Sequence, residues 1–235
     1  MKQDQQKTAF EQCFDTANSR LKMTQREFEK VEMYLKSNDI TDAYEAAFDF
    51  AYSAEQLTLI ARTMPIYTGH PQAQKRMEDQ MIETVPIKIG FTQEGWFCVK
   101  IPALLPKKQK GGPEYISGAL WPAMHRFFYE KDRIRYPKSV IIYRHVFDRN
   151  RPKRENRDHD NNEINMVTDI VAFYVMHDDS PQWCEHYYCS DAGDEDETQV
   201  FVVPQDEFAN WFYSMESSEG KDLYLCESIP EQLQE

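Results

Sequence analysis

The strongest constraint on the fold is a stretch in which two acidic pairs enclose one apolar segment. Asp158 and Asp160 precede residues 162–171, and Asp178 and Asp179 follow them. Two residues apart on an extended chain, Asp158 and Asp160 point to the same side. A helix over 162–171 spans about 15 Å, and the five or six residues after it, if extended, cover roughly 17–20 Å back again. This spacing allows the two acidic pairs to converge.

Converging carboxylates predict a metal site. Three or four of them without an adjacent base are the ligands that a hard divalent cation prefers, and Mg²⁺ is the usual choice. Such a metal suits phosphoryl transfer, because it activates water and neutralises charge on the phosphate. Each acid also has a plain structural interpretation: Asp160 can cap a helix that begins near Asn161, and residues 178–179 can form an ordinary turn. The conjunction of the acids is what favours a site.

Residues 158–180 resemble the core motif of the RusA-type Holliday-junction resolvases. DHDN (158–161), an apolar helix and DDS (178–180) stand in the order of that family's DxDN and DD elements. The flanks are similar too. ALLPKKQKGGPEYISGALWPAMHRFF (103–128) resembles the family's early proline and its Tyr-(Leu/Ile)-Ser before a helix, and KSVIIYRHVF (138–147) resembles the strand that leads into the DxDN loop. The resemblance covers about residues 101–204.

The resemblance implies an α+β fold, with a RusA-like mixed sheet and packed helices, and a metal-dependent endonuclease acting on branched DNA in recombination or repair. It implies Mg²⁺, with Mn²⁺ as a substitute, held by Asp158, Asp160 and Asp179 with Asp178 in support. Asn161 is then expected to orient the first carboxylates by hydrogen bonding. A homodimer is implied, because cutting a four-way junction symmetrically needs two sites. An origin on a mobile element also fits this family.

The chain departs from the family pattern directly after DxDN. The family has a lysine there that faces the scissile phosphate, whereas this chain has Asn-Glu-Ile-Asn at 162–165. Losing such a cation typically costs about 10²–10³ in rate, unless Arg154 or Arg157 replaces it from the loop. The alternative is therefore a catalytically inactive RusA-like module that binds DNA or protein. An accidental match in a helical-plus-sheet interaction protein is a third possibility.

Charge is distributed in three blocks. Residues 1–97 carry 11 Lys+Arg and 15 Asp+Glu, residues 98–157 carry 15 and 5, and residues 158–235 carry 1 and 20. A basic block beside an acidic one suits a protein whose first block contacts a phosphate backbone while the second holds metal. It equally suits a protein whose halves neutralise each other. The candidate DNA-contacting residues are Lys107, Lys108, Lys110, Arg149, Arg151, Lys153, Arg154 and Arg157.

Residues 1–82 predict an N-terminal helical hairpin or three-helix region. An amphipathic stripe begins the chain, Thr24 with Glu27 favours the start of a second segment, and residues 41–61 predict a third. Residues 83–215 are expected to form the RusA-like domain, and 216–235 a weakly ordered acidic tail. The stripe consists of Phe10, Cys13, Phe14, Ala17 and Leu21.

Alternation and turn residues predict the strands of the second region. Residues 86–92 and 95–101 predict a hairpin, and the nearly continuous apolar run 139–147 predicts a central strand. Residues 182–190 and 199–203 predict a second hairpin. Helices are expected from Ser117 to about Tyr129 and over 207–215.

The apolar content and the cysteine count of the sequence predict a soluble protein with no membrane partner. The chain has no run of eighteen apolar residues and no secretory segment at its start. Its five cysteines are irregularly spaced and odd in number, which is not typical of a disulfide framework. A reducing cytoplasm is the expected location.

Overall fold

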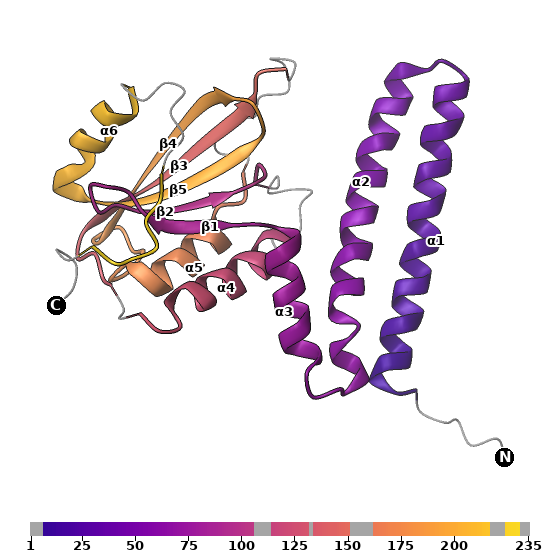
Figure 1. Cartoon of the computed structure of the whole chain (residues 1–235). Coiled ribbons are helices and arrows are strands. Elements are labelled where there is room, and N and C mark those ends of the chain that lie inside the picture. The colour runs from indigo at the N-terminus through magenta and orange to yellow at the C-terminus, as the bar shows by residue number, and fades with distance from the viewer. Residues whose placement is uncertain (1–6, 106–113, 132–133, 151–161, 217–223, 231–235) are drawn as a thin grey trace. The chain divides into compact units, whose positions relative to one another are not determined.

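The computed structural model describes residues 7–105, 114–131, 134–150, 162–216 and 224–230. The chain divides into two compact units, one of residues 1–80 with 110–115 and one of residues 81–109 with 116–235. The helices of the first unit precede the five-stranded mixed sheet of the second (Figure 1). The expected α+β class, with a helical hairpin before a mixed sheet, is confirmed.

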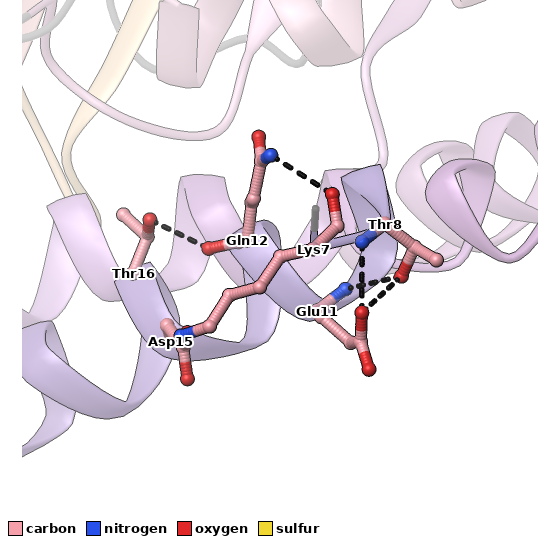
Figure 2. Close-up of polar contacts among 6 residues, drawn as sticks. All are labelled: Lys7, Thr8, Glu11, Gln12, Asp15 and Thr16. Atoms are coloured by element: carbon pink, nitrogen blue, oxygen red, sulfur yellow. Dashed lines mark hydrogen bonds and ion pairs between the residues drawn. The ribbon is translucent and has the colours of Figure 1, made fainter. Parts of the chain in front are cut away.

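Two long helices, α1 (Ala9–Lys36) and α2 (Ile40–Thr63), lie side by side in the first unit (Figure 1). The first turn of α1 is closed by a reciprocal pair. The Thr8 hydroxyl accepts the Glu11 N–H at 3.2 Å, and the Glu11 carboxylate accepts the Thr8 N–H at 2.8 Å (Figure 2). This capping box pairs two N–H groups that a helix start otherwise leaves without partners. The short helix η1 (Ile66–Thr68) and α3 (Ala73–Thr84) follow.

Helix α1 runs unbroken through Thr24, so the predicted new helix start there is wrong. The Thr24 hydroxyl donates to the Arg20 carbonyl at 3.0 Å and lies 2.9 Å from the Ser53 hydroxyl of α2. A threonine inside a helix can bond the carbonyl four residues earlier instead of capping a new helix. Thr24 and Ser53 are both buried, which places a small polar pair at the contact between α1 and α2.

The second unit is built on a sheet with the strand order β1-β2-β5-β3-β4. Its first two strands form the predicted hairpin, with Gly95 at φ 91° in the turn, a left-handed conformation that glycine adopts without steric cost. The predicted central strand has a neighbour on each side. The bounds are β1 (Lys88–Phe91), β2 (Phe97–Ile101), β3 (Ser139–Asp148), β4 (Cys184–Gly193) and β5 (Glu197–Pro204).

Strands β4 and β5 do not pair with each other, so the predicted second hairpin is wrong. Strand β3 lies between them, parallel to β4 and antiparallel to β5. The three residues 194–196 join β4 to β5. They must cross two strand spacings, about 10 Å, which three extended residues can cover. A three-residue connection is therefore compatible both with a direct β4–β5 hairpin and with a third strand between the two.

Helices cover both faces of the sheet. Helices α4 (Glu114–Phe128) and α5 (Asn165–Val175) lie on one face, and α6 (Phe208–Glu216), preceded by η4 (Gln205–Glu207), lies on the other (Figure 1). Helix α4 already includes Ser117, which was expected to cap it. The α6 face buries a cluster of Trp96, Cys98, Val140, Ile142, Phe201, Val203 and Trp211.

Part of the acidic tail joins the edge of the sheet at β1. The N–H and carbonyl of Cys226 exchange 2.8 Å hydrogen bonds with those of Phe91. The two backbones approach closely at Gly90, where a Cβ would lie 2.7 Å from the Cys226 carbonyl oxygen. At Cys226, therefore, the tail pairs with the sheet.

All five cysteines are free thiols, and burial raises the pKa of the Cys184 and Cys189 thiols to about 11. Among the described residues, no helix has both the length and the apolar character needed to cross a membrane.

Candidate functional site

The segment that carries the RusA resemblance is framed by β3, α5 and β4. The start of α5 is held over the later half of β3. The Tyr143 hydroxyl lies 2.7 Å from the Thr168 hydroxyl and 3.3 Å from the Ile164 carbonyl oxygen. Ahead of the helix, Asn162 Nδ2 lies 3.2 Å from His145 Nε2, and both residues are buried.

The end of α5 is held at the beginning of β3. Tyr136, three residues before β3, donates its N–H to the Val175 carbonyl at 2.9 Å, and its own carbonyl accepts the His177 N–H at 3.1 Å. The Arg135 guanidinium donates to the Met176 carbonyl at 2.9 Å. Asp178 therefore leaves α5 at the end of the sheet where β3 and β4 begin.

The predicted return of the chain along the helix is wrong. Helix α5 starts at Asn165 and ends at Val175, so only Met176 and His177 remain before Asp178. Ala172, Tyr174 and Val175 are buried, and their burial extends the apolar helix by a turn beyond the predicted end. The helix spans about 16 Å. In consequence Asn162 and Asp178 lie at opposite ends of α5.

Asp178 is engaged in its own turn. Its carboxylate accepts the Asp179 N–H at 3.0 Å and the Ser180 hydroxyl at 2.6 Å. The Ser180 hydrogen bond is the main reason that the pKa of Asp178 lies below its usual value. Asp179 acts on β4: burial lowers the pKa of His186, and the Asp179 charge offsets part of that effect. Both side chains are exposed, so a cation in solution can reach them.

The described residues alone do not make a metal site. No group of three or more His, Cys, Asp or Glu side chains is placed to hold a metal within this part of the chain. Asp178 and Asp179 supply two of the four carboxylates of the predicted metal site. Asp158, Asp160 and Asn161 lie outside the described residues, so their convergence with Asp179 stays a prediction.

Of the predicted DNA-contacting residues, only Arg149 lies within the described chain. Its N–H donates to the Gly193 carbonyl at 3.0 Å, and its side chain is 3.8 Å from the exposed Asp194 carboxylate. This contact fits the interpretation in which basic and acidic segments offset each other. The others, Lys107, Lys108, Lys110, Arg151, Lys153, Arg154 and Arg157, lie outside the described residues.

The structure brings together a second basic set that the sequence did not reveal. A groove of about 790 Å³ is lined by Lys88, Lys100, Arg126 and Lys131, and Glu227 is the one acid among the described residues that line it. Lys88 and Lys100 stand directly opposite each other on β1 and β2, an arrangement that destabilises a strand pair unless other charges compensate. Lys88 and Lys100 lie on the β1–β2 hairpin, Arg126 on α4 and Lys131 just after it, so the set forms only when α4 packs beside the hairpin.

The groove also has aromatic and apolar walls. The Lys131 ammonium lies 3.6 Å from the centre of the Phe127 ring and donates to the Phe127 carbonyl at 2.8 Å. Tyr224 and Leu225 complete the wall next to β1. Cations beside exposed rings are a combination that suits nucleic acid, since phosphates meet the charges and bases meet the rings.

Comparison with known proteins identifies a family without an assigned activity. No curated protein matches the chain. Residues 4–226 match a family described as a family of unknown function, DUF6100. Because that match includes both the helical hairpin and the sheet, the chain belongs to the DUF6100 family.

Proposed function

We propose that this protein acts on branched DNA as a Mg²⁺-dependent endonuclease of the RusA type, for which Mn²⁺ can substitute. The observation that carries the proposal is the order of the motif along its elements. Strand β3 precedes the DHDN segment, α5 follows it, and the DDS turn separates α5 from β4. In this proposal Asp158, Asp160 and Asp179 hold the metal with Asp178 in support, and Asn161 orients the first carboxylates.

The second candidate function is a non-catalytic module that binds branched DNA. It is favoured by one specific observation. Helix α5 runs uninterrupted to Val175, where Tyr136 holds its end, and it leaves Asn162 and Asp178 at opposite ends of the helix. The absence of a lysine in 162–165 supports it as well. Under this proposal the cationic groove binds phosphates and the aspartates have structural roles.

Cleavage of a labelled four-way junction distinguishes the two candidates. For the endonuclease, we expect cutting in Mg²⁺ and in Mn²⁺, none in EDTA, little cutting of linear duplex, and a loss of about 10²-fold or more in Asp160→Asn. Asp206→Asn is the matched control, because it removes the same charge at an exposed position before α6. Junction binding that persists in EDTA, with no cutting by either protein, would reject the endonuclease and support the binding module.

Contact between the groove and phosphates predicts a change in salt dependence. Lys88→Ala and Arg126→Ala are each expected to weaken binding to junction and duplex alike, because phosphate contacts carry little sequence or shape information. The slope of log affinity against log salt should fall in magnitude by about 0.9 for each phosphate that a variant no longer neutralises. Lys138→Ala is the control, since Lys138 is exposed in the same unit and does not line the groove. Equal slopes in all variants would remove the groove from the DNA interface.

A further inference from the structure

Helix α1 carries a line of exposed apolar side chains. Phe14, Leu21, Phe28 and Leu35 recur every seven residues and are 52–65% exposed. A seven-residue repeat keeps side chains on nearly one line along a helix, and this line is about 32 Å long. Single exposed apolar residues are ordinary, but a contiguous set marks an interaction surface.

The line borders the contact that α1 makes with α2. The buried residues of α1 are Ala17 and Thr24, and Thr24 bonds to Ser53 of α2. Phe28 reaches the margin of that contact, where its ring centre lies 5.2 Å from that of Phe50. The packing of the hairpin therefore leaves this line available.

A row of charges follows the line by one residue. Asp15, Lys22, Glu29 and Lys36 come directly after its four members, so their signs alternate along the helix. The terminal pair already have partners: Asp15 pairs with Lys7 (Figure 2), and Lys36 lies 2.6 Å from Glu32. Such exposed pairs contribute little, so they do not prevent exchange of partners.

The central two charges are more available. No ion pair within the described part of the chain engages Lys22 or Glu29. Glu29 accepts only a long hydrogen bond, 3.3 Å, from the Gln25 side chain. These two charges are consequently the ones that a partner can pair.

The apolar line and the row of charges each match a second copy of α1 that runs in the opposite direction. A second α1 placed antiparallel sets Phe14 opposite Leu35 and Leu21 opposite Phe28, so that each ring meets an aliphatic side chain. The same alignment brings Asp15 near Lys36 and Lys22 near Glu29, with an offset of two residues, about 3 Å along the helix, that these long side chains can span. A parallel alignment would instead put like charges together. Surfaces that match their own reversed copy are those of two-fold symmetric dimers.

We propose that two copies of this chain associate through antiparallel α1 helices, with the two-fold axis beside Gln25. Gln25 lies four residues after Leu21 and three before Phe28, so it is on the same side of the helix as both. An unrelated partner would not require this reversal symmetry of both rows, which is the reason for naming a second copy as the occupant.

Exchange of the central charges tests the pairing. We expect the full-length chain to sediment as a dimer, and Lys22→Glu or Glu29→Lys alone to raise its dissociation constant about tenfold, because each turns two attractive pairs into repulsive ones. The double variant Lys22→Glu/Glu29→Lys should have the dissociation constant of the wild-type dimer. Lys30→Glu, a change of charge at an exposed position outside both rows, is the control. A monomeric wild-type chain, or a double variant no tighter than the single ones, would overturn the proposal.

Cross-linking tests the axis independently of affinity. Gln25→Cys should give a disulfide-linked dimer under mild oxidation, because residues at a two-fold axis meet their own copies. Lys30→Cys, at an exposed position on another side of the helix, should not exceed the wild-type chain, which controls for the native thiols. Equal cross-linking at the two positions would overturn the antiparallel arrangement.

Discussion

Replacing Phe97 with alanine is expected to lower the free energy of unfolding of the sheet unit by about 3–5 kcal/mol. Phe97 is fully buried on β2. Its ring centre lies 5.5 Å from that of Phe91 and 5.9 Å from that of Phe128, so it joins the hairpin to α4. The backbone of β2 pairs on both sides, which prevents the strand from moving to fill the cavity.

Tryptophan fluorescence during denaturant unfolding measures the change in stability of the sheet unit, because all four tryptophans lie within that unit. Tyr129→Ala is the control. It removes a ring of similar size at the end of α4 that is 75% exposed, and it should change stability by less than about 0.5 kcal/mol. Equal losses in the two variants would contradict the packing of α4 against the hairpin.

Replacing Trp211 with alanine is expected to lower the free energy of unfolding by about 3–5 kcal/mol as well, because it detaches α6 from its face of the sheet. The side chain is 1% exposed, stacks on Phe208 at an interplanar angle of 12°, and contacts Phe201 of β5 with ring centres 5.5 Å apart. Its indole N–H has no hydrogen-bond partner among the described residues. A buried unpaired donor costs about 1–3 kcal/mol.

The unpaired donor makes Trp211→Phe the informative companion. Phenylalanine keeps most of the ring packing and removes the buried N–H, so this variant should lose far less stability than Trp211→Ala. Tyr213→Ala, at a 69% exposed position of the same helix, is the control and should be nearly neutral. The same unfolding experiment measures all three. A Phe variant as unstable as the Ala variant would show that the N–H is satisfied in solution.

The elements of this fold that depend on local pattern were predictable. Helix α2 and the β1–β2 hairpin follow from spacing and turn residues, and β3 follows from its nearly continuous apolar run. Helix ends were predicted less well. Thr24 is typical of a helix start, but here it lies inside α1 and contacts Ser53. Helix α5 continues to Val175 because burial against the sheet stabilises its last turn.

The candidate site was predicted only in its residue types. The sequence singled out the acids at 178–179, and the structure places both side chains at an exposed turn after α5. It did not predict the contact of Asn162 with His145, nor the groove that combines Lys88, Lys100 and Arg126. These residues meet only because strands and helices distant in sequence pack together.

By itself the sequence determined the class of the fold, its helical first part and the order of its strands along the chain, because side-chain periodicity and turn chemistry act over a few residues. The tertiary structure alone decided that β3 enters between β4 and β5, and that α5 carries Asp178 away from Asn162. A three-residue connection fits either strand order. The order is decided by which apolar faces α4, α5 and α6 cover, and that is a property of the packed sheet.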